Sequence, residues 1–291
     1  MLTVAVLGTG RMGAGIAGVL AAHGHRVQLY DADPHTAAEA AGRLAATAHR
    51  DLEGTVADAD VVIEAVAERL PVKQELFARV AASNRTALLA TNTSVLPISD
   101  IARHVDVPGR VVGTHWWNPP DLMPLVEVVR GEQTTDETMR AAVDFLSSLG
   151  KTPVRVERDV PGFVGNRLQH ALWREAIALV ADGICDAETV DLVARTTIGL
   201  RLAAMGPLEN ADYVGLDLTL DIHEAVLPSL SRDPGPAPLL RRHVKAGRVG
   251  ARSGHGFLRW PPGTRESAAA RLAAHVRRQR DTIVSIKEET A

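Results

Sequence analysis

The chain has 291 residues, of which 46% are hydrophobic and 23% are charged, an ordinary globular composition that excludes a disordered or collagen-like chain. Thirty-two basic residues against 35 acidic ones give a formal net charge of -3, and without a basic excess we expect no nucleic-acid partner. The single Cys185 excludes an intramolecular disulfide and a multi-cysteine metal site. Because no apolar run is long enough for a membrane helix and the first residues lack a signal-peptide pattern, we expect a cytoplasmic protein without a membrane partner.

The first half of the chain alternates short apolar segments with longer alanine-rich ones. We expect strands at 4–7, 27–30, 61–63, 87–90, 111–114, 125–129 and 154–156. We expect helices between them at 12–23, 34–46, 71–82 and 135–149. Strands that alternate with helices are typical of a parallel sheet covered on both faces, and near-continuous apolar strands fit such a sheet. The pattern predicts an α/β domain over residues 1–159.

A glycine-rich turn, Gly8-Thr9-Gly10-Arg11-Met12-Gly13, follows the first strand and opens a helix. Gly8 permits a tight turn, Gly10 lets the backbone approach a pyrophosphate, and Gly13 lets the helix pack closely on the strand. The second strand ends in Asp31, 18 residues beyond Gly13, where a carboxylate accepts hydrogen bonds from ribose hydroxyls and repels a 2′-phosphate. This predicts a doubly wound, Rossmann-type domain that binds NAD; a purely structural turn is the alternative.

Polar residues also follow the next two predicted strands. Glu64 and Glu68 come after the third strand, and Lys73 lies in the helix that follows. Side chains in such positions reach the carboxyl edge of the sheet, where ligands bind, although Lys73 could equally lie on a solvated helix face. Asn92-Thr93-Ser94 follow the fourth strand and could line a polar pocket or cap the next helix.

The strongest chemical signal is His115 at the end of a strand, together with Glu127 inside an apolar strand. An unpaired carboxylate inside such a strand is costly, so Glu127 needs a donor, and His115 can be that donor. A carboxylate that holds one imidazole nitrogen leaves the other free to exchange a proton. The pair is the base and orienting group expected of a dehydrogenase that acts on a secondary alcohol. His23 and His25, which flank a turn glycine, are interpreted as surface residues or as core residues with satisfied hydrogen bonds.

Strands disappear after Pro161, and residues 160–291 are expected to form an all-helical second domain. Helices are expected at 162–182, 186–193 and 207–227, followed by a proline-rich loop at 231–238, a glycine-rich segment at 247–256 and a polar helical tail. Asn166 lies in the first turns of the long helix, either beside the substrate or as an ordinary exposed residue. By analogy with other two-domain dehydrogenases, this domain is expected to shape the substrate pocket and to form a homodimer.

Taken together, these motifs resemble the L-3-hydroxyacyl-CoA dehydrogenases over nearly all of the chain, from Val4 to about Trp260. The matching segments are 8–13, 92–94, Gly-Thr-His-Trp-Trp-Asn-Pro at 113–119, Leu-Val-Glu-Val-Val at 125–129, Pro-Gly-Phe-Val-Gly-Asn-Arg-Leu at 161–168 and Gly-Pro-Leu-Glu-Asn-Ala-Asp at 206–212. The resemblance implies a Rossmann-type NAD-binding domain followed by a helical substrate and dimerisation domain.

The resemblance also implies a role for each matching residue. His115 matches the catalytic base and Glu127 the glutamate that orients it. Ser94 and Asn166 match substrate-binding residues, and Ser94 also touches the nicotinamide. The remaining matches are to cofactor-side residues: Glu68, Lys73, Asn118 and Arg252. Arg252 stands where the family has a lysine, which keeps the charge and changes the hydrogen-bond geometry.

Two departures from the family pattern bear on the substrate. Trp116-Trp117 replace a pair of phenylalanines and add bulk beside the reacting carbon. Many relatives also carry a long helical hairpin before the Val61-Val62-Ile63-Glu64 strand that helps to hold coenzyme A, whereas only residues 34–58 are available here, enough for short helices and one short strand. The segment Pro124-Leu-Val-Glu is similar in sequence to that of relatives acting on small hydroxy acids, such as gulonate and carnitine dehydrogenases.

The sequence thus predicts reversible NAD-dependent oxidation of a 3-hydroxyacyl thioester to the 3-ketoacyl thioester. One alternative is a small free 3-hydroxy acid or a hydroxyacyl group on a carrier protein. Another is an NAD-binding protein without activity, like the lens crystallins similar to this family, but such a protein has no need of the His115 and Glu127 pair. The chain offers no candidate metal site.

Overall fold

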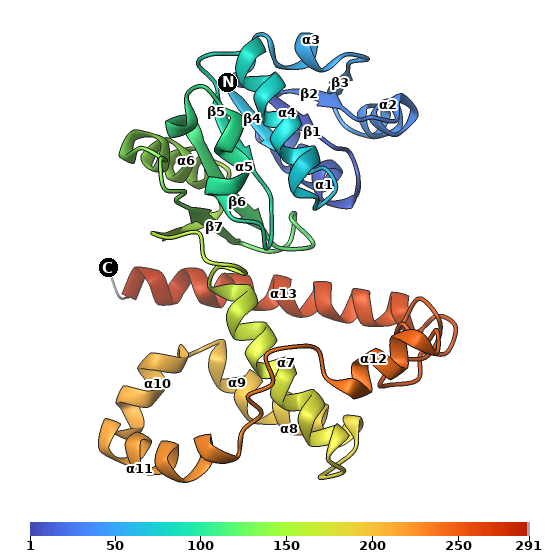
Figure 1. Cartoon of the computed structure of the whole chain (residues 1–291), viewed down its shortest axis with the longest axis vertical. Helices are drawn as coiled ribbons and strands as arrows, with labels where there is room; N and C mark the ends of the chain where they lie inside the picture. The colour runs from blue at the N-terminus through green and yellow to red at the C-terminus, as the bar shows by residue number, and fades with distance from the viewer. Residues whose placement is uncertain (290–291) are drawn as a thin grey trace. The chain divides into compact units, whose positions relative to one another are not determined.

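A computed structural model describes residues 1–289, with side chains described through residue 279. The chain divides into two compact units, Met1–Arg167 and a second unit from Leu168 onward, shown in Figure 1. The sequence places a domain boundary at 159–160, and the end of the expected second domain, 290–291, lies outside the described residues. Within residues 1–289, no helix combines the length and apolar character that a membrane span requires.

The first unit contains a single eight-stranded sheet (Figure 1). Its strands are β1 (Thr3–Leu7), β2 (Arg26–Tyr30), β3 (Ala46–Ala48), β4 (Val61–Glu64), β5 (Leu88–Thr91), β6 (Val111–Trp116), β7 (Leu125–Val129) and β8 (Thr152–Val156). The order across the sheet is β3-β2-β1-β4-β5-β6-β7-β8, and every neighbouring pair is parallel except β6 and β7. The Rossmann-type, mostly parallel sheet expected from the sequence is confirmed.

Helices cover both faces of this sheet and enclose two apolar cores. They are α1 (Arg11–Ala22), α2 (Pro34–Arg43), α3 (Leu52–Val56), α4 (Leu70–Ser83), α5 (Ile98–Ile101) and α6 (Asp136–Ser148), with short 3-10 turns η1 (Ala102–His104) and η2 (Pro108–Arg110). Ile16 of α1 and Met139 of α6 belong to one core, and Phe77 of α4 and Ile101 of α5 belong to the other. The alternating apolar strands and helices in the sequence therefore produce the doubly wound layers.

The region between β2 and β4 is short, as expected, but its helix ends earlier than the sequence suggests. The predicted helix runs to residue 46, whereas α2 ends at Arg43 and Leu44 is extended. The residues that follow pair with β2 instead, because Ala46 and Ala48 lie opposite Val27 and Leu29 in parallel register. Strand pairing at the sheet edge thus overrides local helix propensity here.

The second unit is helical. It contains most of α7 (Gly165–Ala181), then α8 (Ala187–Thr196), α9 (Ile198–Leu202), α10 (Pro207–Val214), α11 (Leu216–Val226), η3 (Leu227–Ser229), α12 (Pro238–Lys245) and α13 (Thr264–Glu289). The single helix expected over 207–227 is broken at Gly215, whose φ of 102° no helix accommodates. The helix expected from residue 162 begins at Gly165, because Gly162 and Phe163 both have left-handed backbones.

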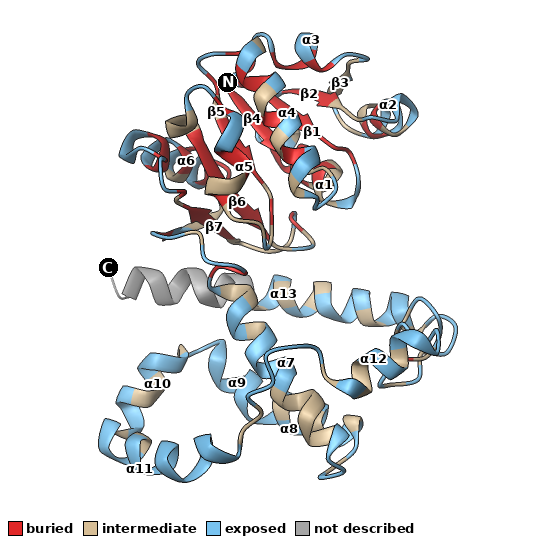
Figure 2. Cartoon of the chain, in the orientation of Figure 1, coloured by how far each residue is buried: buried red, intermediate tan, exposed pale blue. Residues whose placement is uncertain are grey.

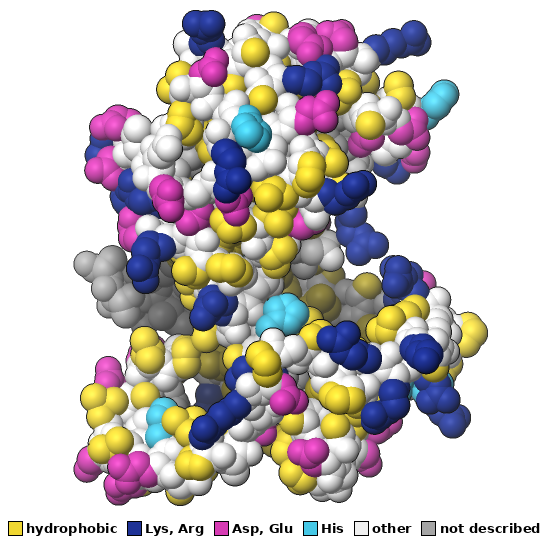
Figure 3. All heavy atoms as spheres, viewed as in Figure 1, with side chains coloured by type: hydrophobic (Ala, Val, Ile, Leu, Met, Phe, Trp, Pro, Cys, Tyr) yellow, Lys and Arg dark blue, Asp and Glu magenta, His cyan; other side chains and the backbone are white. Residues whose placement is uncertain are grey.

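The described side chains of this helical unit, residues 168–279, form no buried core. Among residues 168–279, Gly256 alone is buried, and Figure 2 shows that buried positions are concentrated in the first unit. Large apolar side chains lie open on every major helix; Leu208 is 81% exposed and Tyr213 79%. Figure 3 shows the resulting spread of hydrophobic side chains over the surface of this unit.

Candidate active site

The glycine-rich turn has the geometry that a dinucleotide requires. Gly8 has a φ of 90°, and a Cβ at Gly13 would lie 1.8 Å from the carbonyl oxygen of Gly8, so both positions need glycine. A Cβ at Gly10 would meet nothing within 4 Å, and Gly10 caps α1 without any side-chain hydrogen bond. The first N–H groups of α1 are therefore available to a phosphate that approaches the backbone. Arg11 is exposed at the start of α1, and Met12 follows it half-buried.

Asp31 lies immediately after β2, next to this turn. Its Oδ2 accepts hydrogen bonds from the backbone N–H of Thr9 at 2.7 Å and from the Thr9 hydroxyl at 3.0 Å. Its Oδ1 accepts from the backbone N–H of Asp33 at 3.0 Å. Asp33 itself caps α2, accepting from the N–H of His35 at 3.0 Å. The Asp31 carboxylate is thus held in a fixed orientation beside the turn.

The antiparallel pairing of β6 and β7 brings His115 and Glu127 together. The two residues are direct partners in the register, so their side chains project from the same face. His115 Nδ1 lies 2.7 Å from Glu127 Oε2, and the side chains are 7% and 1% exposed. Because side chains alternate along a strand, Trp116 projects to the other face, where it packs in the core rather than beside His115.

A turn at the start of α7 completes the surroundings of this pair. The backbone N–H groups of Val164 and Gly165 donate to Glu127 Oε1 at 2.9 and 3.0 Å. Phe163 has a φ of 47°, an uncommon conformation for a residue with a side chain, and its ring lies 5.8 Å from the His115 ring. The Trp117 ring is the second ring partner of His115, with 5.0 Å between the two ring centroids. The imidazole is therefore fixed by one carboxylate and two aromatic rings.

These contacts set the charge of Glu127. Burial alone would raise the pKa of Glu127, but the hydrogen bonds from His115, Gly165 and Val164 outweigh it and hold the pKa below its ordinary value. The ionised carboxylate accepts from Nδ1 and so fixes the tautomer of His115. Among the described residues, nothing hydrogen-bonds to His115 Nε2. That nitrogen can accept a proton from a ligand.

The ends of β4 and β5 carry a second polar group of side chains. Lys73 is only 1% exposed, and its Nζ lies 2.6 Å from Glu64 Oε1 and 3.1 Å from Glu68 Oε2. The solvated helix face considered for Lys73 is therefore wrong. Glu68 Oε1 accepts hydrogen bonds from the Thr93 hydroxyl at 2.6 Å and the Ser94 N–H at 2.8 Å. Glu68 thus ties Lys73 to the loop that carries Ser94.

Ser94 and Asn166, the two residues expected to bind the substrate, are linked by a hydrogen bond. The Asn166 amide donates to the carbonyl oxygen of Ser94 at 3.1 Å, so both lie at the same edge of the first unit. Asn92, two residues earlier, accepts from the backbone N–H of Trp116 at 2.9 Å and links the ends of β5 and β6. Asn118 is exposed just beyond β6.

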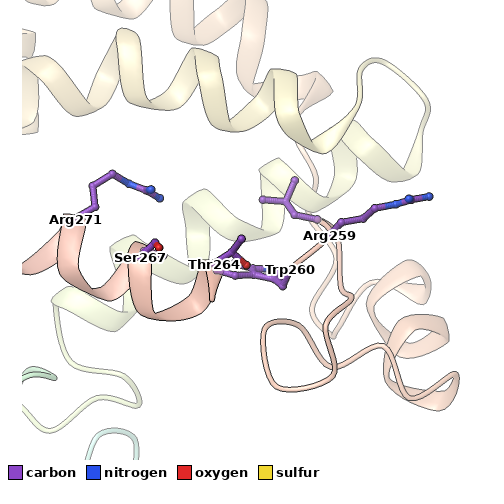
Figure 4. A pocket seen from close by; sticks show the side chains of 7 residues that line it. Arg259, Trp260, Thr264, Ser267 and Arg271 are labelled. Carbon is purple, nitrogen blue, oxygen red and sulfur yellow. The ribbon is translucent and has the colours of Figure 1, made fainter. Parts of the chain in front are cut away.

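Arg252 lies in the other unit and is exposed. That unit also has a pocket of ≈ 240 Å³, whose lining includes Arg259, Trp260, Thr264, Ser267 and Arg271 (Figure 4). The Thr264 and Ser267 hydroxyls already donate to the backbone of Pro261 and Gly263. None of the sequence-predicted site residues lines this pocket. The described residues also contain no group of three or more His, Cys, Asp or Glu arranged to hold a metal ion.

Sequence reasoning missed four contributors to this site. The amides of Val164 and Gly165 cannot be identified from side-chain chemistry, because any residue supplies an N–H. The signal for Phe163 is the Gly162 before it, which marks a turn where the sequence predicts the start of a helix. The signal for Glu64 is its position, because a carboxylate at the end of an apolar strand needs a partner.

Comparison with known proteins identifies the family. The NAD-binding domain of 3-hydroxyacyl-CoA dehydrogenase matches residues 3–53 and 45–160, and the C-terminal domain of 3-hydroxyacyl-CoA dehydrogenase matches residues 162–260. The chain belongs to the 3-hydroxyacyl-CoA dehydrogenase family. It is an NAD-dependent oxidoreductase, as the sequence predicts. The glycine turn, the free N-terminus of α1 and Asp31 fit that cofactor.

The relatives differ in what they act on. A probable 3-hydroxybutyryl-CoA dehydrogenase of Bacillus subtilis is 38% identical over 87% of this chain and 96% of its own length. A 5-formyl-3-hydroxy-2-methylpyridine 4-carboxylate 5-dehydrogenase of Mesorhizobium japonicum is 34% identical over 89% and 91%. A solved structure of an enzyme with that activity, described as an NAD+ dependent dismutase, covers 97% of this chain and 99% of its own at a TM-score of 0.91 and 31% identity. A 3-hydroxyacyl-CoA dehydrogenase structure from Archaeoglobus fulgidus, 34% identical, covers 95% and 98% at 0.71.

Proposed function

We propose that this chain uses His115 and Glu127 to oxidise a hydroxyl group, with NAD as the hydride acceptor. The observation that carries the proposal is the 2.7 Å contact of His115 Nδ1 with a Glu127 carboxylate that two backbone N–H groups also hold. His115 Nε2 takes the hydroxyl proton, and Glu127 stabilises the imidazolium that forms. NAD, when bound, would accept the hydride from the carbon that bears this hydroxyl group. In the reverse direction the imidazolium returns the proton.

Other residues bind and orient in this proposal. Ser94 and Asn166 hold the substrate oxygen next to the reacting carbon, supported by their mutual hydrogen bond. The segment Gly8 to Gly13 holds the pyrophosphate and Asp31 the adenine-side ribose, while Glu68 and Asn118 border the nicotinamide half. Lys73 acts through Glu68, because its own side chain is 1% exposed. Arg252 remains a candidate cofactor residue by resemblance alone.

Two substrate classes fit this chemistry. The first is a 3-hydroxyacyl thioester, the class in the names of several relatives. The second is a small free hydroxylated acid. The second draws support from residues 34–58, where α2, the three-residue β3 and the five-residue α3 replace a long helical hairpin. It is also supported by the likeness to a pyridine carboxylate dehydrogenase, which has the higher TM-score, 0.91 against 0.71. We therefore favour a substrate that does not depend on coenzyme A.

The catalytic assignment is tested by His115→Gln, with NADH formation followed by absorbance over a panel of hydroxy acids and hydroxyacyl thioesters. Turnover should fall by about 10²- to 10⁴-fold, the contribution of general base catalysis, while NADH still binds. His104→Gln, an exposed histidine in the same unit, is the matched control and should keep full activity. Near-normal turnover of His115→Gln would overturn the proposal.

We further propose that the second unit pairs with a second copy of the chain to form a homodimer. A unit of more than 100 residues normally encloses its own core, but among residues 168–279 most of the large apolar side chains are exposed, among them Leu200 at 71% and Leu216 at 63%. Exposed apolar surface on this scale marks an interaction surface. An identical partner covers the same patch on both copies.

A further inference from the structure

Three ionisable side chains that the proposed proton transfer does not use form a cluster beneath the carboxyl edge of the sheet. Glu64 ends β4, Lys73 lies in α4, and Glu68 lies between these elements. Lys73 Nζ is 2.6 Å from Glu64 Oε1 and 3.1 Å from Glu68 Oε2. Glu64 and Lys73 are 0% and 1% exposed, whereas 33% of the Glu68 side chain is exposed. Glu68 is the outer member of the cluster, and the other two support it from inside.

Hydrogen bonds identify Glu64 as an ionised carboxylate. Its Oε1 accepts from the Val66 N–H at 2.8 Å and from the Lys73 ammonium. Its Oε2 accepts from the Thr91 hydroxyl at 2.6 Å. The Thr91 oxygen itself accepts from the Thr93 N–H at 3.2 Å. Every partner of Glu64 is a donor, which suits an acceptor-only carboxylate and not a protonated acid.

Glu68 is ionised as well. Burial raises the pKa of Glu68, but the hydrogen bond from Thr93, the charge of Lys73 and the N–H of Ser94 together bring that pKa below its ordinary value. One ammonium thus lies between two carboxylates. The cluster carries one net negative charge, in a place where water is largely excluded and charge interactions are strong.

The topology places this charge under one half of the cofactor. In a sheet of order 3-2-1-4-5-6, the two halves of a dinucleotide lie on either side of the switch between β1 and β4. Asp31 at the end of β2 holds the adenine side, so the ends of β4 and β5 face the nicotinamide side. The nicotinamide ring is cationic in NAD+ and neutral in NADH.

We propose that Glu64 gives this cluster a net negative charge that favours binding of the cationic nicotinamide of NAD+ over the neutral ring of NADH. The inference rests on the NAD-dependent function proposed above. Without Glu64, Lys73 and Glu68 would form a neutral pair with little preference between the two rings. Glu64 is fully buried, so it acts through its field and through Glu68 and is a positioning residue.

The test is Glu64→Gln, measured as the dissociation constants of NAD+ by calorimetry and of NADH by fluorescence. Glutamine keeps the shape, since its amide oxygen can accept from Lys73 and its amide N–H can donate to Thr91. The dissociation constant of NAD+ should rise about fivefold more than that of NADH, given Coulomb attraction in a partly screened site. Equal changes for both cofactors would mean a structural role only and would overturn the inference.

Two further variants separate charge from shape. Asp60→Asn removes one negative charge just before β4, at the opposite end of the same strand, where Asp60 accepts from the Thr3 N–H; the ratio of the two constants should stay as in the wild type. Glu64→Gln combined with Lys73→Met restores a net charge of minus one, carried by Glu68, and should return the ratio toward the wild-type value. The proposal would be contradicted if the ratio of the NAD+ and NADH dissociation constants changed with the loss of folding stability of each variant and not with the net charge of the cluster.

Neither titration needs a substrate or turnover, so the outcomes separate this inference from the proposed function. If His115→Gln keeps its turnover while Glu64→Gln changes the cofactor ratio, the function fails and the role of Glu64 stands. If His115→Gln is inactive and Glu64→Gln shifts both constants equally, the reverse holds. A wild-type protein that binds neither cofactor would overturn both.

Discussion

The two units of this chain differ in how they satisfy their apolar side chains. In the first, strands such as Val4–Leu7 are 0% exposed, and two cores fill the space between sheet and helices. In the second, the helices leave residues such as Leu208 at 81% exposed. Binary patterning alone therefore forms helices in both, but only the first unit has within itself the surface against which those helices pack. The difference predicts that chemistry depends on the first unit and assembly on the second.

The largest expected effect comes from breaking the pair of side chains in the first unit. Glu127→Gln replaces the carboxylate that stabilises the imidazolium, and turnover should fall by about 10²- to 10⁴-fold. Because the pair lies inside the first unit, light scattering should give the same mass as for the wild type. Full activity, or a change of mass without loss of turnover, would contradict this division of roles. Initial rates at saturating NAD, with the wild type in parallel, provide the measurement.

The next effect concerns the second unit. Leu216 and Leu220, one helical turn apart on α11, are 63% and 58% exposed. Replacing both with lysine should favour the monomer, because each leucine covered by a partner contributes about 1.5–3 kcal/mol. Light scattering at micromolar concentration should give twice the chain mass of 31.1 kDa for the wild type and a lower value for the variant. Asp221→Lys, at an exposed position on another face of the same helix, is the control. A wild-type monomer would contradict the homodimer.

The first unit also shows how much of the structure could be predicted from the sequence. Apolar runs and the glycine turn were sufficient to predict the doubly wound sheet, since both follow from local pattern. The contact of His115 with Glu127 could be suggested from chemistry. The strand register that produces this contact, however, depends on the path of residues 117–124 between β6 and β7. The burial of Lys73 could not be predicted, because a buried ammonium is stable only where Glu64 and Glu68 already lie.

A smaller effect is expected on cofactor choice, at the other end of the sheet edge. The Asp31 carboxylate, fixed by two hydrogen bonds from Thr9, repels a 2′-phosphate, so kcat/KM with NAD should exceed that with NADP by at least about tenfold. Asp31→Ser should narrow this ratio. Equal or better kcat/KM with NADP in the wild type would overturn the role of Asp31. Asp31→Ser should not affect the nicotinamide side near Glu64. The ratio of the NAD+ and NADH dissociation constants should therefore be the same in this variant as in the wild type.

Acid should weaken the first unit through Glu127. Its pKa in the folded chain lies below the ordinary 4.5, so the ionised, hydrogen-bonded form stabilises the fold above that ordinary value. This stabilisation is lost as the pH falls through the lower folded pKa. Thermal unfolding should therefore show a drop in Tm below about pH 4.5 that is smaller in Glu127→Gln. An equal drop in both proteins would assign the acid sensitivity to other groups.

The smallest expected effect concerns the coenzyme A handle. A long ligand with an anionic adenine end needs surface beyond the reacting pocket, and such remote binding energy can be used for positioning at the reacting centre. Here α2 ends at Arg43, β3 spans three residues and α3 five, so the long hairpin is absent from the first unit. One acyl group presented on coenzyme A, on a short pantetheine mimic and as the free acid should therefore give similar kcat/KM. A preference for coenzyme A over the mimic above about tenfold, roughly 1.4 kcal/mol of transition-state binding, would show that other residues hold the nucleotide.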